Sequence, residues 1–525
     1  MNRFITSLIT LASLSAYAQT GDIPKLVVTI TVDQLRGDFL HYFSPAFSET
    51  GFKRLLNEGI YYTNFQYDFP NVCRSSAIAT LSTGTYPCYH GIASDKKFNH
   101  TDRRETSSLF DPDFRGNYTS ETVSPLGLFV STVGDELKLA SDGKSDVYAI
   151  GPNVEEALLS AGRYANAAFW LEDVHGRWAT STYYKEIPWY FDQYNNQRTS
   201  KWENGIAPNV WAPVNQEKMI PYGKNHQPFK YVFYSSDKER FQKLKTSALV
   251  NTEITDLTEK FFEYAGFGER SNPDMLAITY YAGNYKETIS DEYSLEVQNI
   301  YIQLDKEIGR LLSLIDQKVG LKNTLIVLAS TGYYDLKQSA SDTFKPFGTF
   351  YPKRCTALLN MYLIALHGGG NWVDGFYNNQ IYLNKKQIEE SKVHPDEILQ
   401  KTAEYVAQFS GVRKVTTANQ YFLETLESGA SYWRRGLFAK DCGDVILQLH
   451  PGWIIVDEQD ATQNYPVVKH AAIAAPLIFF GHRLAPAKIS RPVKAVSIAP
   501  SIAYILRIRP PNACLDFPLE EIMNN

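Results

Sequence analysis

Short apolar stretches alternate with amphipathic segments along most of this chain. Five stretches are typical of buried strands: Leu26 to Val32, Val147 to Ile150, Met275 to Tyr281, Leu325 to Ala329 and Ala475 to Phe480. Apolar residues recur at helical spacing from Ser290 to Asp316, which predicts a long helix packed against a sheet. This alternation predicts an α/β fold with a mostly parallel central sheet and helices on both faces.

Two less regular regions interrupt this alternation. The first, at about residues 176–250, is rich in Trp, Tyr, Asn and Pro. The second, at about residues 335–441, contains a strand-like stretch from Met361 to Leu366 and a helical segment from Pro395 to Phe409. Because core strands follow each region, we interpret both as insertions into one core that spans residues 19–525.

Residues 1–18 have the features of a secretory signal peptide. Arg3 supplies a positive charge, an apolar stretch follows, and Ala16 to Ala18 is a small-x-small cleavage motif before Gln19. The apolar stretch is shorter than the roughly 20 residues that a membrane span needs. We therefore expect a periplasmic or otherwise exported protein, cleavage near Ala18-Gln19, and no transmembrane anchor after cleavage.

Composition narrows the functional classes. Hydrophobic residues make up 44% and charged residues 21% of the chain, as in ordinary globular proteins. A net charge of -5 gives no electrostatic case for a nucleic-acid partner. The five cysteines have no zinc-finger spacing, and their odd number leaves at least one unpaired within a monomer. Whether any two of them pair stays open.

Motifs near the N-terminus carry the candidate chemistry. Asp33 ends the first apolar strand, where open parallel sheets bind ligands. The segments Gly51 to Leu56, Ser82 to Pro87 and His90 to Ile92 follow. In order and spacing these motifs resemble the alkaline phosphatase superfamily, in the branch of nucleotide pyrophosphatase/phosphodiesterases and PafA-type alkaline phosphatases. The resemblance implies a three-layer α/β/α sandwich with inserted cap segments.

The resemblance also implies phosphoryl transfer at two zinc ions. Three Asp and three His hold the metals, and a Thr or Ser at a helix N-terminus is the nucleophile. In this chain the six ligand positions carry Asp33, Tyr280, Asn284, Ser330, Thr331 and Ala474, and the nucleophile position carries Arg74. Positions that contact substrate in the monoesterases carry Asp95, Asn153 and Glu155 in place of Asn, Lys and Arg.

These substitutions oppose catalysis. An arginine is not a nucleophile at neutral pH, and one retained ligand of six does not hold two zinc ions. We therefore predict a pseudoenzyme with no catalytic residue, metal or cofactor, which acts with a protein partner of the cell envelope that the sequence does not identify. We also predict that Asp33 and Arg74 form an ion pair in the vacated site, because a buried carboxylate needs a counter-charge.

Two alternatives remain open at this point. One is a divergent metal-dependent phosphomonoesterase or phosphodiesterase, with zinc in a rebuilt site. The other is a sensor that binds an anion or a nucleotide in the old pocket. Neighbouring polar residues have simpler roles: Ser75 and Ser76 suit a helix N-terminus, and His90 belongs to a structural turn. We interpret the Arg36-Gly37-Asp38 tripeptide as a coincidence.

Overall fold

The computed structural model describes residues 23–185, 187–203, 210–213, 228–287, 294–332, 348–423, 430–450, 452–456 and 474–524. The predicted signal peptide lies outside these ranges. The central sheet contains β1 (Leu26–Asp33), β2 (Ile60–Gln66), β5 (Gly116–Asn117), β6 (Val147–Gly151), β7 (Ala167–Leu171), β8 (Trp178–Ser181), β11 (Asp274–Tyr281), β12 (Thr324–Ser330), β19 (Ala475–Gly481), β20 (Ala487–Ile489) and β21 (Val493–Lys494). Its strand order is β20-β2-β19-β12-β1-β11-β6-β7-β8-β5, with β21 beside β2.

The middle of this sheet is parallel, as the sequence predicts. Strand β1 lies between β11 and β12, and β6 and β7 continue the parallel set. The register places Asp33 beside Tyr281, and Val32 between Tyr280 and Ser330. The carboxyl ends of three strands therefore meet at one edge of the sheet, where ligands bind in open α/β folds.

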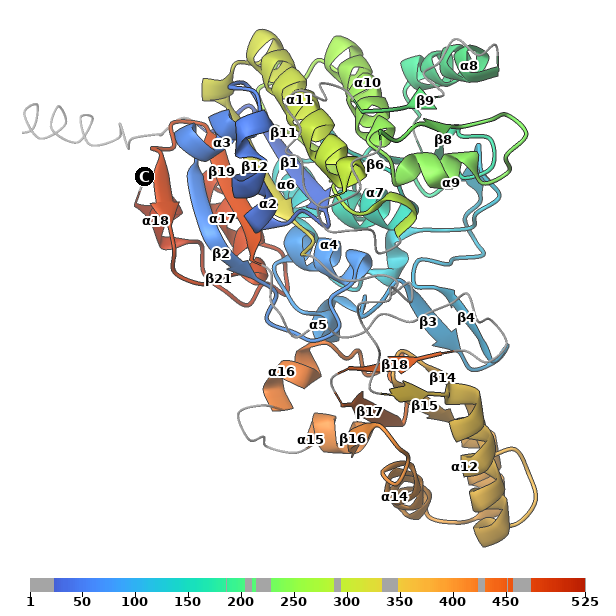
Figure 1. The fold of residues 1–525 in the computed structure, drawn as a ribbon. Helices are drawn as coiled ribbons and strands as arrows, with labels where there is room; N and C mark the ends of the chain where they lie inside the picture. Colours follow the sequence, from blue (N-terminus) through green and yellow to red (C-terminus); the bar gives the residue numbers. More distant parts are fainter. Residues whose placement is uncertain are drawn as a thin grey trace, which may run out of the picture.

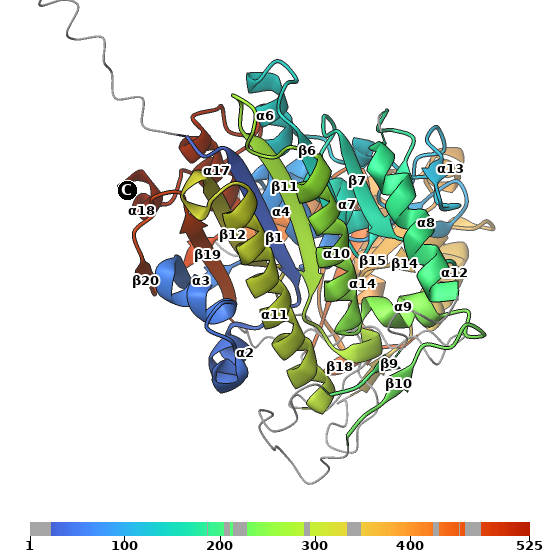
Figure 2. The same cartoon turned by 90° about the horizontal axis from the view of Figure 1, so that it is seen from above.

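Helices cover both faces of the sheet, which confirms the three-layer arrangement. Helices α10 (Leu249–Tyr264) and α11 (Leu295–Lys318) cover one face, and α4 (Arg74–Thr83), α6 (Val133–Ala140), α7 (Val154–Ala161) and α17 (Ile498–Leu506) cover the other (Figures 1 and 2). Helix α11 begins after Ser294, whose hydroxyl accepts a hydrogen bond from Val297 N. The predicted long helix is therefore present, and residues 288–293 at its predicted start lie outside the described ranges.

Residues 348–456 contribute a smaller lobe, which lies below the core in Figure 1. Its sheet has the order β14 (Val373–Tyr377), β15 (Gln380–Leu383), β17 (Val445–Leu449) and β16 (Val412–Thr417). Helices α12 (Pro352–His367) and α14 (Pro395–Val406) pack on it. The strand predicted from Met361 to Leu366 is wrong, because this run is the last part of α12. Cys355, Leu359 and Leu363 are buried at helical spacing, and a short apolar run alone does not distinguish helix from strand.

Aromatic and charged side chains join the lobe to the core. The Phe98 ring, on β3 (Lys96–Asn99), stacks on Tyr382 of β15 with centroids 4.4 Å apart. Arg103 Nε lies 3.0 Å from Asp374 Oδ1. The lobe falls largely in the second predicted insertion, whereas the first contributes β8 to the central sheet. The boundaries of both insertions stay predictions.

Candidate functional site

Asp33 and Arg74 meet at the carboxyl edge of the sheet. Helix α4 begins at Arg74 because Cys73 N donates to Ser76 Oγ at 3.0 Å and caps the first turn. The guanidinium then reaches Asp33 Oδ2, at 3.0 Å from Nε and 2.9 Å from Nη2. The Asp33 side chain has no exposed surface, and that of Arg74 is 15% exposed. The ion pair predicted from the sequence is present.

Glu156, which the sequence analysis missed, adds a second carboxylate to this pair. Its Oε1 lies 3.2 Å from Arg74 Nε, and its Oε2 accepts a hydrogen bond from Asn153 N at 2.7 Å. Complete burial raises the pKa of Glu156, and the charge of Arg74 offsets this only in part. Two buried carboxyl groups share one guanidinium, so the Glu156 carboxyl favours its protonated form.

Thr331 engages the other oxygen of Asp33. The Thr331 hydroxyl donates to Asp33 Oδ1 at 2.8 Å and accepts from Gln34 N at 2.9 Å. Beside it, the Ser330 hydroxyl donates to the Leu35 carbonyl at 2.7 Å and fixes the loop after β1. Both oxygens of Asp33 therefore accept hydrogen bonds from protein donors.

The other predicted site residues make different contacts. The Tyr280 hydroxyl lies 2.9 Å from the Thr255 hydroxyl on α10. The Asn284 carbonyl accepts from the Tyr281 hydroxyl at 2.6 Å, and the carbonyl of the exposed Ala474 accepts from Gly37 N at 2.9 Å. The structure thus brings together Asp33, Arg74 and Thr331, with Ser330 beside them, and places Tyr280, Asn284 and Ala474 in other roles.

The N-terminus of α4 is capped by Asp95. Ser75 donates to Asp95 Oδ1 from its backbone N at 3.0 Å and from its hydroxyl at 2.6 Å. A helix N-terminus favours an anion, and here a carboxylate of the chain itself binds to it. Burial, together with the charge of Asp95, raises the pKa of Glu155 to about 7. Carboxyl groups therefore surround the first turn of α4.

Other residues singled out from the sequence have structural roles. His90 is buried, its Nδ1 accepts from Ile92 N at 3.1 Å, and burial lowers its pKa to about 3. Arg36 is buried and pairs with Asp38 at 2.7 Å, so the tripeptide is folded onto itself. All five cysteines lie in the described ranges, and each is a free thiol.

The residues present do not fit a two-zinc centre. Of the six positions to which the resemblance assigns metal ligands, only Asp33 carries an anionic donor, and both of its oxygens are engaged by Arg74 and Thr331. A metal at Asp33 would have to displace the guanidinium. Across the described ranges, no group of three or more His, Cys, Asp and Glu side chains is arranged to hold a metal ion.

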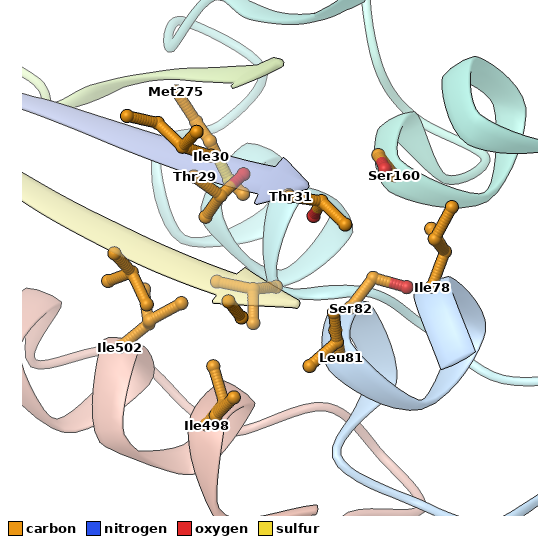
Figure 3. A pocket seen from close by; sticks show the side chains of 14 residues that line it. Thr29, Ile30, Thr31, Ile78, Leu81, Ser82, Ser160, Met275, Ile498 and Ile502 are labelled. Atoms are coloured by element: carbon orange, nitrogen blue, oxygen red, sulfur yellow. The ribbon is translucent and has the colours of Figure 1, made fainter. Parts of the chain in front are cut away.

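A small cavity lies beneath α4, on the side of the sheet that α17 covers (Figure 3). Its volume is about 30 Å³, and it is lined mainly by apolar side chains, among them Ile30, Ile78, Leu81, Ile498 and Ile502. This volume is far below the roughly 300–1,000 Å³ of a ligand pocket. The cavity is therefore a packing defect rather than a substrate site.

Comparison with known proteins agrees with this architecture. The family model described as type I phosphodiesterase / nucleotide pyrophosphatase matches residues 27–472. The chain belongs to this family. It lies within the alkaline phosphatase superfamily, in the branch that also contains the PafA-type enzymes.

Curated relatives match over nearly the whole chain. A protein of Myroides odoratus named calcium-transporting ATPase is 29% identical, covering 95% of this chain and 94% of its own. Alkaline phosphatase PafA of Elizabethkingia meningoseptica is 25% identical over 95% of this chain and 94% of its own. The crystal structure of wild-type PafA superposes with a TM-score of 0.81 at 23% identity, covering 95% of this chain and 99% of that one, which shows the shared fold.

Proposed function

We propose that this chain is an exported, catalytically inactive member of its phosphoesterase family that acts by binding or assembly with a protein of the cell envelope. One observation carries the proposal. Both oxygens of Asp33 are engaged by protein donors, Oδ2 by Arg74 and Oδ1 by Thr331. The chain thus fills with its own side chains the position that would otherwise bind a metal.

The charges around Arg74 argue against the sensor of an anion or a nucleotide. Arg74 stands at the nucleophile position that the resemblance assigns, and the carboxyl groups of Asp33 and Glu156 already bind its guanidinium. The Asp95 carboxylate accepts from the first turn of α4, where an anionic ligand would otherwise gain hydrogen bonds. An added anion would have to displace a carboxylate both at the Arg74 guanidinium and at the first turn of α4.

Export is part of the proposal and rests on the sequence. The charged start, the apolar stretch and the small-x-small motif before Gln19 support a cleaved signal peptide. Within the described ranges, none of the helices combines the length and the apolar character needed to cross a membrane. A mass measurement on the protein recovered from the periplasm tests this step: the expected mature chain begins at Gln19, and an intact N-terminus would contradict it.

A second candidate is a divergent phosphoesterase, which the relatives favour. A 25% identical protein that covers nearly the whole chain is named an alkaline phosphatase. This candidate requires metal ligands outside the six positions discussed above. It also requires a nucleophile other than Arg74.

Metal content and turnover separate the two candidates. The mature protein is dialysed with excess zinc, freed of unbound metal and analysed for zinc, and is then assayed with p-nitrophenyl phosphate and bis-p-nitrophenyl phosphate. The proposal expects less than one zinc per chain and no turnover above background. About two bound zinc ions together with turnover would establish the phosphoesterase instead.

A further inference from the structure

Helix α12 of the lobe has an unusual outward face. Its inward face buries Cys355, Leu359 and Leu363 in the core of the lobe. The face turned away from the sheet carries Ala357, Met361, Ile364 and Ala365, all of them exposed. Their spacing of four, three and one residues forms a single stripe along the helix.

The neighbouring helix shows that this apolar face is specific to α12. Helix α14 packs in the same lobe core and buries Ile398 and Val406. After Pro395 at its first position, its exposed residues are polar, and include Glu397, Gln400 and Glu404. Helix α12 lies on the outer edge of the lobe, away from the central sheet (Figure 1). The side chain of Met361 on this helix is 65% exposed. A contiguous exposed apolar stripe marks an interaction surface.

The charges on α12 indicate which kind of partner fits this stripe. Lys353 and Arg354 are exposed in the first turn, which has no acidic residue, and no charged side chain follows before His367. Cations are unfavourable near the positive end of a helix dipole and favourable near the negative end. Arg354 therefore gains a favourable interaction when it lies beside the C-terminus of a facing helix.

We propose that α12 pairs in antiparallel orientation with α12 of a second copy of this chain, around a two-fold axis at Met361. The axis places Ala357 of one copy opposite Ala365 of the other, and these small side chains allow the helices to approach closely. It also brings Arg354 to the last carbonyl groups of the facing helix, just before Gly368. The arrangement is isologous, so a single surface satisfies both copies.

The size of the surface predicts a weak dimer. One pair of 16-residue helices buries less than the roughly 800 Å² per partner of a standard interface. The pairing depends on the lobe alone and does not rest on the function proposed for the site at Asp33. An enzyme and a pseudoenzyme would form it equally.

Sedimentation of the mature protein over a range from micromolar to submillimolar concentration tests the pairing. The wild type is expected to pass from monomer to dimer. Met361→Glu places two carboxylates against each other at the axis and is expected to raise the dimer dissociation constant by about 100-fold or more. The matched control Gln400→Glu adds the same charge to the exposed face of α14 and is expected to leave the constant unchanged. Equal thermal unfolding of the variants shows that they are folded.

The orientation of the pair has its own test. Arg354→Glu is expected to weaken the dimer, whereas Arg354→Lys retains the charge and the dimer. A wild type that stays monomeric throughout the range, or a dimer insensitive to Met361→Glu, would overturn the proposal. So would a monomeric wild type that binds phosphatidylethanolamine and phosphatidylglycerol vesicles through Met361, because the stripe would then bind a lipid surface.

Discussion

Arg74 Nε and Glu156 Oε1 lie 3.2 Å apart, although the two residues belong to the first turns of different helices, α4 and α7. The same guanidinium bonds to Asp33 at the end of β1. One side chain therefore ties a strand end to two helix starts. This arrangement links β1, α4 and α7 at the carboxyl edge of the sheet.

We expect the folding stability to depend on the charge balance among Asp33, Arg74 and Glu156. Arg74→Ala leaves Asp33 and Glu156 buried without their guanidinium, which is expected to cost about 3–5 kcal/mol of unfolding free energy. Urea unfolding measures the loss. The matched control is the neutral triple variant D33N/R74M/E156Q, which buries no charge and is expected to be clearly more stable than Arg74→Ala. A triple variant as unstable as the single one would show that volume, rather than charge, decides the effect.

We expect the folding stability to depend on pH through Glu155. Burial and the charge of Asp95 raise the pKa of Glu155 to about 7, from 4.5 without these effects. Between these values the folded protein binds the proton more tightly than the unfolded chain, so the stability contributed by this group is present below about pH 4.5 and is lost as the pH rises to about 7. Glu156 is shifted in the same direction. Glu155→Gln is therefore expected to reduce the fall in melting temperature across this window.

A variant on the neighbouring helix α4 provides the control for the pH profile of Glu155, which lies on α7. Ile78 lies one turn after Arg74 and lines the cavity beneath α4. Ile78→Ala enlarges that cavity and is expected to lower stability by about 2–5 kcal/mol at every pH, with the slope of the wild type. Stability that rises with pH between 4.5 and 7 in the wild type would contradict the assignment to Glu155.

The third prediction concerns Thr331, whose hydroxyl links Asp33 Oδ1 to Gln34 N. Thr331→Val keeps the shape but leaves a buried N–H without its acceptor and a carboxylate without one donor. The expected cost is about 1–3 kcal/mol in chemical unfolding. Thr331→Ser retains the hydroxyl and is expected to stay close to the wild type. Equal losses in the two variants would indicate that the methyl group, and not the hydrogen bonds, matters.

Part of this site follows from the sequence and part does not. The sequence predicts the pair of Asp33 and Arg74, because the family resemblance places both residues at one site and a buried carboxylate needs a counter-charge. Glu156 was missed because an acidic residue three positions after Asn153 is typical of an ordinary helix N-terminus, and nothing in that pattern indicates what its other oxygen contacts. The exchange of a metal ligand for Thr331 was recognised, but its bonds to Asp33 and Gln34 depend on the loop after β12.

We expect that restoring a hydroxyl at the nucleophile position does not by itself restore catalysis. Arg74→Thr supplies a hydroxyl at the N-terminus of α4, yet the positions to which the resemblance assigns ligands still carry Tyr280, Asn284, Ser330, Thr331 and Ala474. A hydroxyl without a metal or an adjacent base is not activated. The variant is therefore expected to show no turnover of p-nitrophenyl phosphate above that of Arg74→Ala, and to lose stability as that variant does. Zinc-dependent turnover in Arg74→Thr alone would mean that metal ligands exist elsewhere, and that Arg74 blocks an otherwise intact phosphoesterase.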